Sequence, residues 1–197
     1  MYSISNIIIQ AAINRFGTDA MAAWAAFWKL DAIFWMISSA FGIAITTFVG
    51  QNYGALKYQR VKKSVWVCAG MQTATAIFVS AIMIVFCRPL LGIFTTDTHV
   101  LKIGSMMVMI LAPFYVIFTP TEIFSGALRG IGNVMIPTII TICGVCLLRI
   151  AWVAIALPIR HGLSTIMVGY PVTWLLSSVA FIIYYACRMR GFGKDRS

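Results

Sequence analysis

Asp31 is the residue whose type and position most clearly suggest chemistry, because it lies inside a long apolar stretch of the chain. Trp24, Trp28 and Trp35 stand at −7, −3 and +4 relative to it, and a helix would place these side chains on one face. A carboxylate among tryptophan rings suits an organic cation, because the carboxylate and the ring quadrupole both attract positive charge in a low dielectric. The pattern predicts a cation-binding face inside an apolar helix.

The same residues also fit a structural role. Asp31 would then pair with Lys29 or Arg149, and the tryptophans would pack or anchor at the membrane interface. Lys29 is two residues from Asp31 and points to roughly the opposite side of a helix, which weakens that pairing. A buried Arg149 needs a carboxylate or several carbonyl groups, so it either pairs with Asp31 or meets an acid in a missing part of the protein. With either partner, Arg149 is a candidate binding residue.

Glu122 is a second candidate acid, one turn before Gly126 and near the end of an apolar stretch that contains Pro113 and Pro120. Proline interrupts the hydrogen-bond ladder of a helix, and broken helices are common in transporters. One interpretation of this setting is a role for Glu122 in ion coupling. The alternative is a carboxylate at the membrane boundary that pairs with a loop cation such as Arg129.

The start of the chain carries a polar stripe. Ser3, Asn6, Gln10 and Asn14 recur at intervals of three and four residues and share one face of a helix. Because lipid does not easily tolerate such a face, the stripe either lines a cavity or forms hydrogen bonds to another helix. Asn6 and Gln10 are therefore further candidates for ion or substrate binding.

The elements that carry these residues are predicted to be membrane-spanning helices. The chain has 197 residues, of which 61% are hydrophobic and 10% charged, with a mean hydropathy of +0.93, whereas a soluble domain usually carries about 25% charged residues. The composition excludes a soluble domain and a disordered segment and favours an all-α, polytopic membrane protein. Apolar stretches long enough to span the bilayer lie at 20–49, 64–87, 100–125, 134–158 and 163–187.

A sixth apolar stretch, 2–14, is too short to span the bilayer, because a helix of that length reaches about 20 Å. It lacks the charged leader and the cleavage pattern of a signal peptide. We interpret it as a helix whose first half is missing, so that residues 1–197 form a single lobe.

The chain has a formal net charge of +10. Its basic residues are distributed unevenly between the two sides of the predicted membrane. One side has nine of the 15 cations, namely Lys57, Arg60, Lys62, Lys63, Arg129, Arg188, Arg190, Lys194 and Arg196. The other side has Arg15, Arg88, Lys102 and Arg160. By the positive-inside rule the nine face the cytoplasm, which predicts a multi-pass protein of the plasma (inner) membrane with its C-terminus in the cytoplasm. A face for nucleic acid would not be divided between alternate loops.

The sequence shows no catalytic or metal-binding constellation. Cys143 and Cys146 form a C-x-x-C inside an apolar helix, whereas a redox or metal site would need a polar, accessible setting and further ligands. His99 and His161 lie in loops without carboxylates at metal-ligand spacing. We therefore expect packing cysteines, no metal, no cofactor and no enzyme activity.

Several motifs together resemble the second half of a transporter of the multidrug and toxic compound extrusion (MATE) family. The motifs are residues 17–20 (GTDA) leading to 29–31 (KLD), 46–55 (TTFVGQNYGA), 126–133 (GALRGIGN) with Pro137, and 149–152 (RIAW). Their glycines are expected to permit tight turns between helices, at Gly50, Gly54, Gly126, Gly130 and Gly132.

This resemblance implies a six-helix lobe of a twelve-helix protein that exports organic cations or other drug-like compounds in exchange for H⁺ or Na⁺. It also implies that intramembrane acids bind the ion and the substrate, and Asp31 and Glu122 occupy the matching positions. The implied partners are the missing N-terminal lobe of the same transporter, small cationic substrates and the lipid bilayer, with no role for nucleic acid.

Two other functions fit the same sequence. A flippase of the same superfamily for a lipid-linked sugar would need several intramembrane cations for its anionic substrate, and this chain offers Lys29 and Arg149. A non-transporting membrane scaffold subunit would use Asp31 and Arg149 only as a structural pair.

Overall fold

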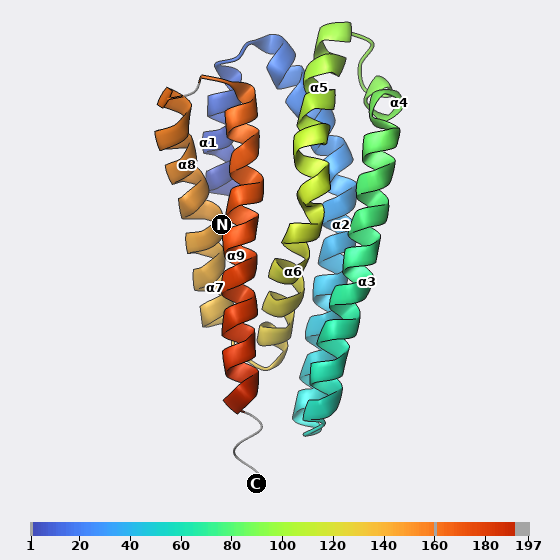
Figure 1. The fold of residues 1–197 in the computed structure, drawn as a ribbon, viewed down its shortest axis with the longest axis vertical. Coiled ribbons are helices and arrows are strands. Elements are labelled where there is room, and N and C mark those ends of the chain that lie inside the picture. Colours follow the sequence, from blue (N-terminus) through green and yellow to red (C-terminus); the bar gives the residue numbers. More distant parts are fainter. Residues whose placement is uncertain (1, 160, 192–197) are drawn as a thin grey trace.

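The computed structural model describes residues 2–159 and 161–191, with side chains described for 5–159 and 161–188. The described residues form helices joined by short connections and contain no strand (Figure 1). In chain order the elements are α1 (Tyr2–Asn14), α2 (Thr18–Gly54), α3 (Tyr58–Val85), α4 (Cys87–Gly92), α5 (Thr98–Leu111), the 3₁₀ turn η1 (Ala112–Phe114), α6 (Tyr115–Gly130), α7 (Met135–Thr141), the π-helix η2 (Ile142–Leu147), α8 (Leu148–Ile159) and α9 (Leu163–Gly191).

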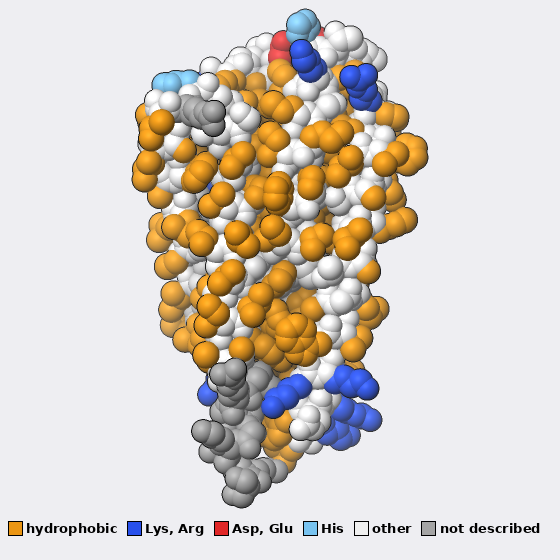
Figure 2. All heavy atoms as spheres, viewed as in Figure 1, with side chains coloured by type: hydrophobic (Ala, Val, Ile, Leu, Met, Phe, Trp, Pro, Cys, Tyr) orange, Lys and Arg blue, Asp and Glu red, His pale blue; other side chains and the backbone are white. Residues whose placement is uncertain are grey.

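Five of the described helical stretches are long and apolar enough to cross a membrane, which confirms the predicted all-α membrane architecture. They are Thr18–Gly54, Tyr58–Val85, Thr98–Gly130, Met135–Ile159 and Leu163–Arg188. On the face seen in Figure 2, Lys and Arg side chains gather at the two ends of the molecule and hydrophobic side chains fill the band between them. This distribution is that of a protein whose middle band contacts lipid.

The connections alternate between the two ends of the bundle. Figure 1 shows the α2–α3 and α6–α7 connections at the end of the bundle where α9 ends, and the α1–α2, α4–α5 and α8–α9 connections at the other end. The loop cations follow this alternation, except that the side chains of Arg160, Arg190, Lys194 and Arg196 lie outside the described residues. The end that faces the cytoplasm stays a prediction.

Two of the five spans are interrupted. In the first, η1 separates α5 from α6 at Pro113, which has no N–H to continue the α-helical ladder. The Ser80 hydroxyl of α3 donates a hydrogen bond to the Ala112 carbonyl at this break, at 2.7 Å. Pro120, which we expected to break the ladder as well, lies inside α6.

In the second interrupted span, η2 separates α7 from α8. Thr141 and Arg149 flank η2 and are eight residues apart, which in a regular α-helix would turn their side chains about 80° from each other. A π turn absorbs one extra residue, and this reduces the difference to about 20°. The π-helix therefore brings Thr141 and Arg149 to the same side of the span.

The expectation that the motif glycines lie at tight turns is wrong for Gly50 and Gly126. Gly50 lies inside α2 and Gly126 lies inside α6, whereas Gly54 and Gly130 are the last residues of these two helices. A Cβ on Gly126 would lie 2.8 Å from the Gly42 carbonyl oxygen, and a Cβ on Gly130 would lie 2.6 Å from that of Thr46. These glycines allow the backbones of α2 and α6 to approach closely.

Gly132 does form the expected turn. It follows α6 with a φ of +87°, in the left-handed region that favours glycine. Glycines inside the helices were assigned to turns because a glycine spacing of four residues is compatible both with a turn and with a close contact between helices. Only the packed structure distinguishes these two roles.

Candidate functional site

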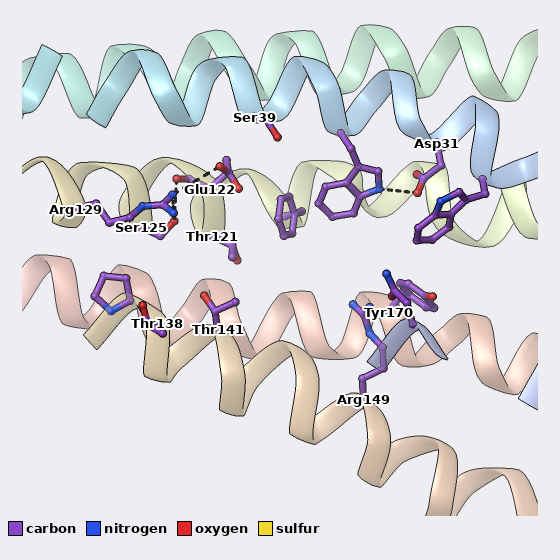
Figure 3. A pocket seen from close by; sticks show the side chains of 15 residues that line it. Asp31, Ser39, Thr121, Glu122, Ser125, Arg129, Thr138, Thr141, Arg149 and Tyr170 are labelled. Carbon is purple, nitrogen blue, oxygen red and sulfur yellow. Dashed lines mark hydrogen bonds and ion pairs between the residues drawn. The ribbon is translucent and has the colours of Figure 1, made fainter. Parts of the chain in front are cut away.

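A cavity of about 520 Å³ lies between α2 and α6 on one side and α7, α8 and α9 on the other (Figure 3). All of the predicted site residues line it except Gln10. The lining residues are Asn6 of α1; Trp28, Asp31, Trp35 and Ser39 of α2; Phe118, Thr121, Glu122, Ser125 and Arg129 of α6; Pro137, Thr138 and Thr141 of α7; Arg149 of α8; and Tyr170 of α9.

Helical periodicity explains how α2 and α6 supply these side chains. On α2, Trp28, Asp31, Trp35 and Ser39 follow one another at intervals of three or four residues, and on α6, Phe118, Glu122, Ser125 and Arg129 do the same. Each set therefore forms one stripe along its helix. The two stripes face each other because the glycine contact holds α2 against α6.

Asp31 is fixed by two hydrogen-bond donors at one end of the cavity. Its side chain is buried, with 5% exposed. The indole Nε1 of Trp35 donates to Oδ2 at 2.6 Å, and the hydroxyl of Tyr115 donates to Oδ1 at 2.5 Å. Because Tyr115 belongs to α6, Asp31 links the two helices as well as facing the cavity.

Aromatic rings surround this carboxylate. Tyr115 stacks on Phe34 with ring centroids 4.0 Å apart, and Trp35 meets Phe118 edge to face at 4.7 Å. Trp28 is 40% exposed and lines the cavity, whereas Trp24 is buried and packs on Phe27 at 5.6 Å. The predicted tryptophan face is thus divided, with two rings on the cavity and one in the core.

The structure places Arg149 and Lys29 differently. Arg149 is buried, and its guanidinium lies 3.9 Å from the centre of the Tyr170 ring, facing the cavity from the group of helices opposite Asp31 (Figure 3). Lys29 is exposed, and its ammonium group lies over the Phe94 ring at 5.1 Å, beyond the cavity lining. Of the two cations considered as partners of Asp31, Arg149 is the one that shares the cavity with it.

Glu122 occupies the other end of the cavity. Its side chain is 22% exposed and contacts Arg129 at 3.9 Å, and Arg129 also donates to the Ser125 hydroxyl at 3.3 Å. The carboxylate group lies against Gly42 of α2, where an added Cβ would come within 3.0 Å of the Glu122 Cδ. The pairing with Arg129, one of the two alternatives for Glu122, is present, and both residues line the cavity.

Hydroxyl groups line the cavity around Glu122. Thr138 donates its proton to the Val134 carbonyl at 2.8 Å, and Ser125 donates to the Glu122 carbonyl at 3.2 Å. Thr121 shares a hydrogen bond of 2.9 Å with Ser178 of α9. A hydroxyl that donates its only proton to the backbone offers lone pairs to the cavity, so this end presents acceptor oxygens.

The polar stripe of α1 contributes one residue to the cavity. Asn6 lines it, whereas Gln10 donates to the Asn14 side chain at 2.9 Å and lines a separate groove beside Met21 and Lys29 of α2. The side chain of Ser3 lies outside the described residues. The structure therefore joins Asn6 to the candidate site and leaves Gln10 outside it.

A bundle of membrane-length helices around a polar cavity with buried charges defines a polytopic membrane protein of the transporter class. The MatE family model matches residues 1–155, and the chain belongs to this family. Members of the family are transporters rather than enzymes, and multidrug efflux is a function of the family.

Curated relatives match most of this chain. The Bacillus subtilis protein named "Probable multidrug resistance protein YoeA" is 26% identical over 193 residues, which cover 94% of this chain and 40% of the relative. A protein of Shewanella oneidensis named "FAD transporter" is 25% identical over 177 residues, covering 90% of this chain and 39% of the relative. The chain thus spans about 40% of the length of these relatives.

Solved structures share the fold. A transporter of the MOP superfamily from Pyrococcus furiosus superposes with a TM-score of 0.90 at 17% identity, covering 98% of this chain and 44% of that one. A structure described as an outward-facing multidrug resistance MATE family transporter also gives a TM-score of 0.90, at 17% identity and the same coverage. The described bundle is therefore a half-length lobe of this architecture.

Proposed function

We propose that this chain is the C-terminal lobe of a multidrug antiporter that exports organic cations or drug-like compounds in exchange for H⁺ or Na⁺. Membership of the MatE family and the names of the relatives support an efflux function. The coverage of about 40% supports a second, N-terminal lobe as the partner, because alternating access requires two bundles that move around a central site.

The observation that carries this proposal is the buried carboxylate of Asp31 on the aromatic wall of the cavity. The carboxylate binds either the coupling ion or the cationic substrate, because two positive charges in one small desolvated site repel each other. Binding of the ion to Asp31 from the outside would then displace the drug, which leaves toward the outside. The ion gradient drives efflux through this competition.

Asp31 also couples the charge in the cavity to the position of the helices. As a carboxylate it accepts hydrogen bonds from Trp35 of α2 and Tyr115 of α6. Bound H⁺ or Na⁺ takes up part of the acceptor capacity of the carboxylate and weakens these two bonds. A change in the occupant of Asp31 therefore changes how firmly α6 is held to α2.

The experiment is efflux of a fluorescent organic cation by the complete two-lobed transporter carrying Asp31→Asn. We expect gradient-driven efflux to be lost while the amount of protein in the membrane is unchanged, because an amide binds neither H⁺ nor Na⁺ in competition with a cation. The matched control is Asp19→Asn, which changes an exposed acid in the first turn of the same helix. Unchanged efflux by Asp31→Asn would overturn the assignment.

A second candidate substrate class is an anionic aromatic compound. It is favoured by the two arginines that line the cavity, Arg149 over the Tyr170 ring and Arg129 near Glu122, and by the similarity to the relative named "FAD transporter". Arginine binds phosphate and carboxylate groups through paired hydrogen bonds. For this candidate, Arg149→Gln would abolish export of flavin nucleotide, and for the cation exporter it would leave export of organic cations in place.

A further inference from the structure

Two of the five acidic residues of the chain face the same cavity from its two ends. Asp19 and Asp97 lie at the exposed starts of α2 and α5, and Asp195 lies outside the described residues. Asp31 and Glu122 both line the cavity, and Figure 3 shows them well apart along it, with Arg129 beyond Glu122. Acids are costly inside a membrane, so each of the two is a candidate for binding a ligand.

The distance between the two carboxylates follows from α2. Glu122 lies against Gly42, which is eleven residues after Asp31 on that helix. At a rise of 1.5 Å per residue, the two carboxylates are about 16 Å apart along the cavity. No simple monocation reaches both.

The wall between the two ends suits an uncharged linker. Trp35 and Phe118 meet edge to face at 4.7 Å and supply aromatic surface, and Ser39 and Thr121 lie between these rings and Glu122 along their helices. Aromatic faces bind apolar and cationic groups, and Arg149, which lines the cavity opposite Asp31, lies over the Tyr170 ring.

Both carboxylates retain the capacity to bind a cation. Each oxygen of Asp31 accepts one donor, and a carboxylate has about four lone-pair positions in total. Glu122 contacts Arg129 at 3.9 Å, near the limit for an ion pair, and the Arg129 side chain is 44% exposed, so water screens the pair. A ligand cation at this end also meets the acceptor oxygens of the surrounding hydroxyl groups.

We propose that this cavity is a two-point site that selects elongated dications whose positive groups are about 16 Å apart, with Glu122 as the residue that determines this length preference. The inference rests on the proposed function for the direction of transport, and the binding preference itself is independent of it. Linking two charged groups makes the second contact intramolecular, so affinity is highest when the linker matches the span.

The test is equilibrium binding of a series of bis-quaternary ammonium alkanes of increasing length to the complete transporter in detergent, followed by displacement of a fluorescent organic cation. Monoquaternary compounds of the same carbon number serve as matched ligands. We expect affinity to peak at the member whose nitrogens are about 16 Å apart and to exceed that of its monoquaternary match by at least about tenfold.

The variant Glu122→Gln distinguishes two explanations of a length dependence, namely a two-point site and simple lipophilic binding. We expect it to remove the peak, so that each dication binds like its monoquaternary match measured in the same variant. The control Asp19→Asn keeps the peak. Affinity that rises steadily with length in both wild type and Glu122→Gln would overturn the inference, as would tighter binding of zwitterions than of dications of equal length.

The two proposals fail in distinguishable ways. A length peak that disappears in Glu122→Gln, together with no effect of Asp31→Asn on efflux, would support the two-point site and contradict the proposed coupling role. Loss of efflux in Asp31→Asn with no length peak in binding would do the opposite.

Discussion

The two ends of the cavity contain the same kind of charged group in different surroundings. Asp31 is 5% exposed and receives donors from Trp35 and Tyr115 at 2.6 and 2.5 Å. Glu122 is 22% exposed, pairs with Arg129 at 3.9 Å and is surrounded by hydroxyl groups. The enclosed carboxylate responds strongly to a change of occupant because little water compensates for it, whereas the open one is screened and contributes mainly recognition.

Among the substitutions that test this difference between the two ends, Tyr115→Phe is expected to have the largest effect on stability. It removes the α6 donor to Asp31 and keeps the stack on Phe34, and loss of a hydrogen bond to a charged group costs about 1.5–3 kcal/mol. We expect a lower unfolding temperature in detergent and weaker binding of organic cations.

The matched control for this substitution is Tyr170→Phe. The buried Tyr170 hydroxyl has no hydrogen-bond partner among the described residues, so its removal should change the free energy of unfolding by less than about 0.5 kcal/mol. Equal destabilisation by the two substitutions would show that the Tyr115 contact does not hold Asp31.

A smaller effect is expected for Gly42→Ala, which acts on the Glu122 end alone. The added Cβ would approach the Glu122 carboxyl group, and overpacking of this kind costs about 1–3 kcal/mol. We expect lower stability and a shifted or lost length preference for dications, with monocation binding retained at Asp31.

The control for Gly42→Ala is Gly70→Ala in α3, where a Cβ meets nothing within 4 Å. Alanine is the better helix former, so this change should be neutral or slightly stabilising. If Gly42→Ala behaves like Gly70→Ala in both stability and binding, Glu122 is not held against Gly42.

The smallest effect on stability is expected for Arg129→Gln. The pair with Glu122 is long and partly exposed, so its loss should change the free energy of unfolding by less than about 1 kcal/mol. Dication affinity should rise, because the competing cation at the Glu122 end is removed. A fall in dication affinity, measured beside unchanged monocation affinity, would mean that Arg129 orients Glu122 for binding.

Local periodicity in the sequence predicts the helices and much of one face of the cavity. The spacing of Trp28, Asp31 and Trp35 places them together on α2, and the same spacing places Phe118, Glu122 and Ser125 together on α6. The direction in which such a face points depends on the other helices. For this reason Tyr115, which is 84 residues from Asp31, was not predicted as its hydrogen-bond partner.

Irregular helix geometry, the true end of α6 and the ordinary character of the hydroxyl residues account for other features that the sequence did not predict. The π-helix turns Thr141 and Arg149 to one side, although regular helical spacing would separate them. Arg129 was assigned to a loop, whereas α6 continues to Gly130 and places it on the cavity. The hydroxyl residues give no signal by themselves, because serine and threonine are ordinary residues of membrane helices.

The central claim is that Asp31 exchanges the coupling ion for the organic cation, and competition binding tests it most directly. The apparent Kd of the complete transporter for a fluorescent organic cation would be measured at increasing H⁺ and, separately, Na⁺ concentration. We predict that the wild-type Kd rises with one of the two ions, and that Asp31→Asn binds more weakly with a Kd independent of both. A wild-type Kd that responds to neither ion, or an equal response in Asp31→Asn, would contradict this account.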